Sequence, residues 1–208
     1  MKTSIKRDAT GMRASYKRSD FGEMKRGQFV AFARAALLQN TATESLSVRP
    51  AVDADIEGMR TLLNEIIRVG GTTAITSELS PDEMREWFIS GEAVVSCLAA
   101  VDSDEAIIGF QSLNKYGSLP AGWVDIATFA SRSRHKSGVG SALFARTREA
   151  ASQLGFSTIN ATIRVVNEGG LAYYSRMGFE THLVEDGDPQ AQGRVFNRLH
   201  KRFDLVQR

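Results

Sequence analysis

Beyond residue 46, apolar side chains recur with two spacings, one typical of helices and one typical of strands. The first helical stripe comprises Ile56, Met59, Leu62, Leu63, Ile66 and Ile67. Asp53 or Asp55 is expected as its N-cap, and the pair Gly70-Gly71 is expected to stop it. The pattern therefore predicts an amphipathic helix with one buried face.

A second helix is predicted by the sequence Ser80-Pro81-Asp82-Glu83, which is a capping box with proline at the first helical position. Short apolar runs bounded by turn residues predict strands at 46–50, 93–101, 107–116, 123–130, 158–166, 179–184 and 195–203. Two later helices are expected at 140–155 and 169–177. This order predicts one α/β (or α+β) domain without an internal repeat.

Residues 1–45 differ from the rest of the chain. They hold nine Lys/Arg and four Asp/Glu, a net charge of +5, whereas residues 46–208 carry −3 within a total of +2. A helix is plausible from Asp20, because an acidic capping pattern there precedes apolar residues at helical spacing. We expect a basic N-terminal extension over 1–45 and a catalytic or binding domain over 46–208.

Composition narrows the class of protein. Apolar residues make up 42% and charged residues 24%, which is ordinary for a globular domain. The single cysteine, Cys97, lies in an apolar run and is expected to be a buried thiol, with no disulfide framework. No run is long enough to span a membrane and no signal peptide is evident, so a cytoplasmic location is expected. His182 and His200 lack metal-ligand spacing, and no metal is expected.

A glycine loop carries the first candidate chemistry. Gly138-Val139-Gly140 lies between a predicted strand and a predicted helix, and glycine allows a tight turn and close approach of a ligand. The free N–H groups of a helix's first turn attract an anion. Four basic residues precede the loop: Arg132, Arg134, His135 and Lys136. The loop suits a pyrophosphate, although a helix start with a solvated basic loop explains it too, and the P-loop and dinucleotide fingerprints are absent.

A second segment decides between these readings. Asn167 is followed by a small residue three positions on, tyrosine seven on, and Gly-Phe eleven and twelve on, at Gly170, Tyr174, Gly178 and Phe179. This pattern resembles the second signature of the GNAT acetyltransferase superfamily. The glycine loop resembles the acetyl-CoA motif of the same superfamily, with His135 at the usual Gln/Arg place. Because backbone amides make most of that contact, we expect the change to be tolerated.

The resemblance implies a fold and a co-substrate. The fold would be the GNAT fold, a mixed central sheet splayed between the fourth and fifth strands with helices on both faces. Three further features resemble the phosphinothricin and amino-acid N-acetyltransferase branch: Val48-Arg49-Pro50-Ala51, Asn64 in the first helix, and Met84-Arg85-Glu86-Trp87-Phe88. Acetyl-CoA would be the co-substrate, bound by Thr128, Phe129 and Ala130 along a strand edge, by His135, Lys136, Ser137, Gly138, Val139, Gly140 and Ser141 at the pyrophosphate, and by Asn167, which contacts pantetheine or fixes the splayed strand.

Two residues are candidates for catalysis. The resemblance places Tyr174 as the acid that protonates the leaving thiolate, the alternative being a tyrosine that only packs on the sheet. Asp125 is an acid inside an apolar strand, where burial would raise its pKa towards that of a general base. In the phosphinothricin branch that the chain resembles, the acidic residue proposed as the general base stands at this place. Asp125 would otherwise be a solvent-facing strand residue.

The acceptor is less defined. A primary amine of a small molecule such as an amino acid is expected, with Arg68 or Arg164 as a partner for its carboxylate, unless both are solvated surface residues. Two alternatives remain: a protein or RNA-bound acceptor held by the basic extension, or a CoA-binding module without catalysis. A homodimer is possible, and nucleic-acid binding is not expected.

Overall fold

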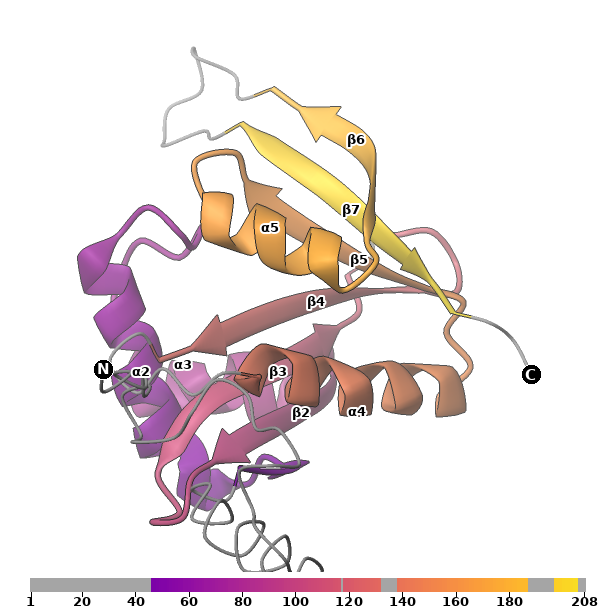
Figure 1. Ribbon diagram of the computed structural model, residues 1–208. Coiled ribbons are helices and arrows are strands. Elements are labelled where there is room, and N and C mark those ends of the chain that lie inside the picture. The colour runs from indigo at the N-terminus through magenta and orange to yellow at the C-terminus, as the bar shows by residue number, and fades with distance from the viewer. Residues whose placement is uncertain (1–45, 117, 132–137, 187–196, 206–208) are drawn as a thin grey trace, which may run out of the picture. The chain divides into compact units, whose positions relative to one another are not determined.

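The computed structural model describes residues 46–116, 118–131, 138–186 and 197–205 (Figure 1). Its centre is a seven-stranded sheet in the order β1-β2-β3-β4-β5-β7-β6. The strands span β1 Ser47–Pro50, β2 Val94–Val101, β3 Ile107–Asn114, β4 Trp123–Ala130, β5 Thr158–Arg164, β6 Glu180–Glu185 and β7 Arg198–Asp204. The β4–β5 pair is parallel, and the other neighbouring pairs are antiparallel.

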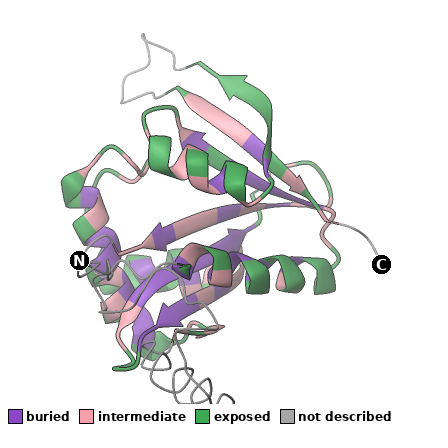
Figure 2. Cartoon of the chain, viewed as in Figure 1, coloured by how far each residue is buried: buried purple, intermediate pink, exposed green. Residues whose placement is uncertain are grey.

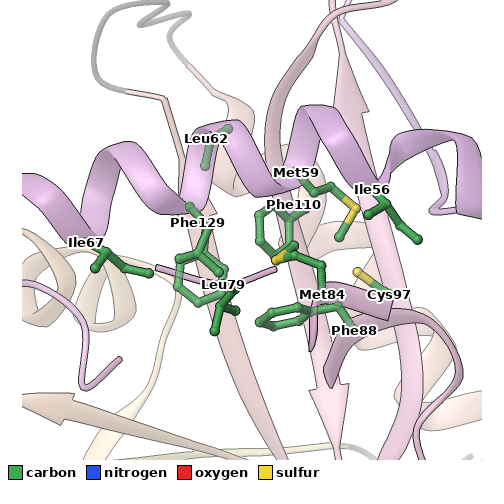
Figure 3. Close-up of a cluster of buried hydrophobic side chains, with 11 residues drawn as sticks. Ile56, Met59, Leu62, Ile67, Leu79, Met84, Phe88, Cys97, Phe110 and Phe129 are labelled. Atoms are coloured by element: carbon green, nitrogen blue, oxygen red, sulfur yellow. The ribbon is translucent and has the colours of Figure 1, made fainter. Parts of the chain in front are cut away.

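One face of the sheet is covered by α2 (Ile56–Val69), α3 (Pro81–Arg85) and a π-helical turn (Glu86–Ser90). The buried residues of these elements pack on Phe110 of β3 and Phe129 of β4 (Figure 3). Phe88 meets both rings edge-on, with centroids 5.2 and 5.8 Å away. Cys97 lies in the same cluster, as expected, and burial raises the pKa of its thiol to about 12.

The opposite face is covered by α4 (Val139–Gln153) and α5 (Glu168–Arg176). Phe144 of α4 and Tyr174 of α5 belong to one buried cluster with residues of β3, β4 and β5. Helices thus lie on both faces, and the mixed α/β sheet expected from the sequence is confirmed.

Local capping agrees with the sequence at one helix and differs at another. Ser80 and Glu83 form the predicted capping box at α3, with Ser80 Oγ accepting from the Glu83 amide at 3.2 Å. Asp55 is the N-cap residue of α2, but its side chain does not cap the helix. It accepts instead two hydrogen bonds from the Arg49 guanidinium, at 2.7 and 2.8 Å. The ion pair joins β1 to the start of α2.

The sheet is splayed between β4 and β5. Parallel pairing covers only Trp123–Thr158, Val124–Ile159 and Asp125–Asn160, although both strands continue. Beyond that last pair the two strands diverge (Figure 1). β5 remains paired to β7 along its whole length, and β4 remains paired to β3. The gap therefore leaves an edge of β4 beside Thr128, Phe129 and Ala130.

Burial is uneven across the sheet. The strands next to α2 and α4 are mostly buried, whereas all six residues of β6 are exposed (Figure 2). Among the described residues, no helix is long and apolar enough to cross a membrane. The expected helix from Asp20, the division at residue 45 and the loop 132–137 lie outside the described residues.

Candidate active site

Asp125 lies at the point where the sheet splays. Its neighbours Val124 and Ile126 face the cluster under α4 and α5, and strand alternation turns Asp125 to the other face. Asn160, its partner on β5, donates from Nδ2 to Asp125 Oδ1 at 2.6 Å. Burial raises the pKa of Asp125 to about 6, and hydrogen bonding to Asn160 opposes that rise. A carboxylate of this kind is basic enough to accept a proton at neutral pH.

Tyr174 occupies the other face at the same gap. Its hydroxyl and Thr128 Oγ1 are 2.9 Å apart, which ties α5 to the free stretch of β4. Burial raises the pKa of the Tyr174 hydroxyl above its ordinary value, with smaller contributions of the same sign from Tyr173 and Asp125. A phenol is protonated at neutral pH and can donate that proton, and the raised pKa makes Tyr174 a weaker acid than a free phenol.

Tyr173, which the sequence argument passed over, joins α5 to the glycine loop. Its hydroxyl donates to the carbonyl of Gly140 at 2.8 Å and accepts from Gln111 Nε2 at 3.3 Å. Gln111 also donates to Thr128 Oγ1 at 2.7 Å. A Cβ on Gly140 would lie 2.6 Å from Tyr173 Cε2, so glycine is required there by the tyrosine ring. The signal for Tyr173 that the sequence offered was its place directly before the motif residue Tyr174.

Gly138 begins α4 in a left-handed conformation, with φ +98°. Among the described residues, nothing lies within 4 Å of the position of a Cβ on Gly138, and the first turn of α4 holds no acidic residue. The first amides of α4 belong to Val139, Gly140 and Ser141. His135, Lys136 and Ser137 lie outside the described residues.

Asn167 is the N-cap of α5. Its Oδ1 accepts from the Gly170 amide at 2.9 Å, and its Nδ2 donates to the carbonyl of Thr72 at 2.9 Å. The bond to Thr72 holds the α2–α3 loop against the start of α5. A Cβ on Gly170 would lie 2.5 Å from Asn167 Nδ2, which explains the small residue three positions after the asparagine.

The two arginines considered for an acceptor carboxylate have protein contacts. Arg68 Nε pairs with Glu78 at 2.6 Å. Arg164, at the end of β5, donates to the Thr73 carbonyl at 3.0 Å and so braces the same loop as Asn167. Arg164 is therefore the one that borders the splayed gap, whereas Arg68 forms an exposed ion pair.

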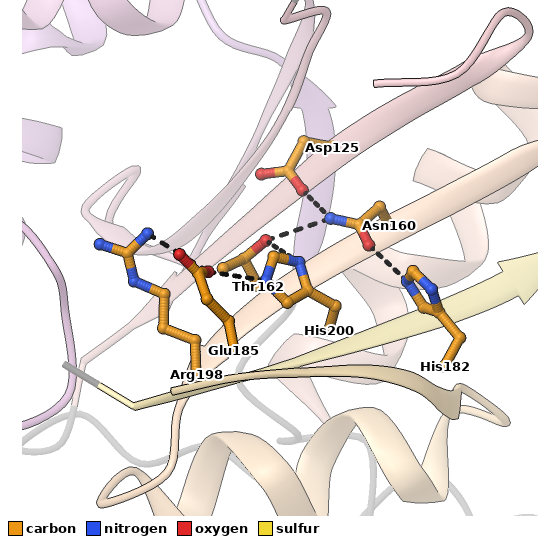
Figure 4. Close-up of polar contacts among 7 residues, drawn as sticks. All are labelled: Asp125, Asn160, Thr162, His182, Glu185, Arg198 and His200. Atoms are coloured by element: carbon orange, nitrogen blue, oxygen red, sulfur yellow. Dashed lines mark hydrogen bonds and ion pairs between the residues drawn. The ribbon is translucent and has the colours of Figure 1, made fainter. Parts of the chain in front are cut away.

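A polar network on the face of Asp125 was not foreseen from the sequence (Figure 4). It runs from Asp125 through Asn160 and Thr162 of β5 to side chains of the β6–β7 hairpin: His182, Glu185, Arg198 and His200. These residues are 35 to 75 positions away from Asp125 in the chain, and only the strand order brings them together. Among the described residues, no group of acidic, histidine or cysteine side chains could hold a metal ion.

Solved structures show the same fold. An N-acetyltransferase from Staphylococcus aureus Mu50 superposes with a TM-score of 0.68, at 17% identity, over 78% of this chain and 99% of that one. A phosphinothricin acetyltransferase of Sinorhizobium meliloti, solved in complex with acetyl-CoA, superposes with a TM-score of 0.66, at 23% identity, over 77% and 88%. The fold is that of N-acetyltransferases.

Sequence comparison gives the family. The model of the acetyltransferase (GNAT) family matches residues 59–179, more than half of the chain, which therefore belongs to this family. The phosphinothricin N-acetyltransferase of Streptomyces coelicolor is 27% identical over 161 residues, covering 75% of this chain and 92% of the relative. The chain is thus an acetyltransferase enzyme of the GNAT family, as its glycine loop and Asn167 pattern indicated, and it is similar to phosphinothricin N-acetyltransferases.

Proposed function

We propose that this enzyme transfers the acetyl group of acetyl-CoA to a primary amine of a small molecule, such as an amino acid or an amino-acid analogue. The observation that carries the proposal is the pair Asp125 and Tyr174 on opposite sides of the splay, one a half-buried carboxylate and the other a buried phenol. Asp125 can accept a proton near neutral pH and the Tyr174 phenol can donate one, as a base and an acid in one site must. The phosphinothricin N-acetyltransferase relative supports the acceptor class.

Acetyl-CoA fits the residues present. The start of α4 at Gly138 offers amide donors and a favourable dipole to the pyrophosphate. The β4 edge at Thr128–Ala130 has lost β5 as a partner and can pair with the amides of the pantetheine arm, as an added strand would. Asn167, the N-cap of α5, holds the α2–α3 loop through its hydrogen bond to Thr72.

The chain's residues have distinct tasks in the transfer. Asp125 accepts the proton that the amine must lose, directly or through a water molecule. The nitrogen attacks the thioester carbonyl carbon, forming a C–N bond, and the C–S bond breaks. Tyr174 donates its hydroxyl proton to the departing sulfur, and Thr128 holds that hydroxyl in place. Holding both substrates in the gap supplies much of the rate, on the order of 7–11 kcal/mol for well-oriented reactants.

The test is release of the CoA thiol from acetyl-CoA across amino acids, their analogues and polyamines, with products identified by mass. Asp125→Asn and Tyr174→Phe should each lower kcat by roughly 10²–10⁴-fold. Tyr173→Phe is the matched control for Tyr174→Phe, because it removes a hydroxyl that contacts the glycine loop. Its effect on acetyl-CoA binding should be larger than its effect on kcat.

Acetyl-CoA binding without transfer to any amine would contradict the proposal in favour of a CoA-binding module. Transfer by wild type that Tyr174→Phe leaves unchanged would remove Tyr174 from the mechanism.

A further inference from the structure

The β6–β7 hairpin brings two imidazoles to the side chains that surround Asp125 (Figure 4). The pairing between β6 and β7 shifts between Thr181 and Leu183, so His182 lies at a β-bulge. Bulges re-aim a side chain out of the regular alternation. Here the ring of His182 packs edge-on against Trp123, with centroids 5.3 Å apart, and its Nε2 is 3.0 Å from Asn160 Oδ1.

The chemistry of the atoms fixes the direction of this contact. An amide oxygen only accepts hydrogen bonds, so His182 Nε2 must carry the proton. The amide nitrogen of Asn160 then faces Asp125 at 2.6 Å. The reverse orientation of the amide would place its oxygen against the Asp125 carboxylate, which is tolerable only if Asp125 is protonated. His182 consequently favours the orientation that suits an ionised Asp125.

A second chain of contacts acts on the other amide hydrogen. Asn160 Nδ2 also donates to Thr162 Oγ1 at 3.1 Å. With that oxygen accepting, the Thr162 hydroxyl is free to donate to His200 Nδ1, 3.2 Å away. His200 Nε2 in turn lies 2.9 Å from a Glu185 carboxylate oxygen, which calls for a proton on Nε2. The whole chain is satisfied with one proton on each imidazole.

We propose that His182 and His200 are positioning residues for Asp125, acting through Asn160 and Thr162 to hold the Asn160 carboxamide with its N–H towards the carboxylate. This inference rests on the proposed function, in which Asp125 is the base. It extends the active site to a hairpin that contributes no residue to either GNAT motif described above.

Several ionisable groups act on Asp125 besides this network. His200 lies across β5, Tyr116 follows β3, and Tyr174 lies on the other face; each interacts electrostatically with Asp125. The pKa of His182 is lowered, chiefly by partial desolvation of its ring and then by His200, which favours the neutral imidazole near pH 7. These groups remain in place in the variants described next, apart from the one replaced.

The experiment is a ¹³C-carboxyl NMR titration of Asp125 in the full chain without substrate, from about pH 4 to pH 8. The signal is assigned by its loss in Asp125→Asn. His182→Phe keeps the aromatic contact with Trp123 and removes the N–H donor. Thr162→Val keeps the shape of threonine and removes its hydroxyl. Thr162→Ser keeps the hydroxyl, and Thr181→Val alters the exposed neighbour of His182 as the matched control.

His182→Phe and Thr162→Val should each move the titration of Asp125 up by about one pH unit, because a hydrogen bond to the charged form is weakened. Thr162→Ser and Thr181→Val should titrate like wild type. An unchanged Asp125 titration in the first two variants would overturn the proposal, and so would an equal shift in Thr181→Val. Thermal melting of each variant separates these effects from loss of folding.

The titration needs no acceptor, so it separates the two proposals. Shifted titrations in an enzyme that acetylates no amine would leave the positioning network standing and contradict the proposed function. If acetyl transfer depends on Asp125 but the titrations do not move, the proposed function stands and the positioning network is contradicted. In an active enzyme, the acid limb of kcat/KM should shift by the same amount as the NMR titration.

Discussion

Asp125 and Asn160 form the last pair of the parallel β4–β5 ladder, and their side chains meet at 2.6 Å where the strands begin to separate. Asp125 has a paired residue on β5, whereas the residues of β4 that follow it have none. The candidate base thus stands at the inner end of the gap in which the thioester is proposed to lie.

The pH dependence of the enzyme follows from Asp125. Because its pKa is raised to about 6, the base is protonated and inactive below that pH and ionised above it. We expect kcat/KM to rise with pH through about 6, and Asp125→Asn to lose this limb together with most of the rate. Profiles from pH 5 to 8 would check this. Asp104→Asn, in the exposed β2–β3 turn, is the control and should keep the wild-type limb.

Gly140→Ala should disturb the start of α4. The added Cβ would lie 2.6 Å from the Tyr173 ring, so the ring or the helix must shift, at a cost of about 1–3 kcal/mol in unfolding free energy. Binding of acetyl-CoA, measured by calorimetry, should weaken as well. Removing the Tyr173 ring relieves the clash. Gly140→Ala should therefore lower the unfolding free energy less in a Tyr173→Ala background than in wild type. Purely additive effects would refute the contact.

The two adjacent glycines of α5 should respond in opposite ways. Gly170→Ala brings a Cβ to 2.5 Å from Asn167 Nδ2 and should displace the side chain that caps α5 and holds Thr72. Gly169→Ala meets nothing closer than 3.9 Å and should be neutral or stabilising by up to about 1 kcal/mol. Urea denaturation of both variants tests the difference. Equal destabilisation would show that Asn167 is not constrained as described.

Asp55→Asn should destabilise the domain by about 2 kcal/mol at pH 7, because it removes the charge partner of Arg49 at a buried position. The hydrogen bond from Arg49 lowers the pKa of Asp55 below its ordinary value. The contribution is therefore present above about pH 4 and is lost as pH falls through the lowered pKa.

Unfolding of wild type and Asp55→Asn, measured at pH 7 and near pH 3, should show the gap in stability closing in acid. Asp82→Asn breaks a fully exposed ion pair with Arg85 and should change stability little at either pH. A gap between wild type and Asp55→Asn that persists undiminished in acid would contradict the assignment.

Much of the fold was determined by local sequence. The stripe from Ile56 to Ile67 specified α2, the box from Ser80 to Glu83 specified the start of α3, and the apolar run 123–130 gave β4 to the residue. The glycine loop and the Asn167 pattern led to the family, since Gly138 begins α4 and Asn167 caps the Gly170 amide at the start of α5, which are features local to each helix start.

Tertiary structure alone decided what surrounds the candidate base. The sequence pointed to Asp125 as an acid in an apolar strand, but its partners come from β5, β6 and β7, and strand order and register set those distances. The sequence also did not indicate that the Tyr173 ring requires glycine at position 140. Short-range patterns determine which elements form, whereas contacts between distant elements depend on how the sheet pairs and where it opens.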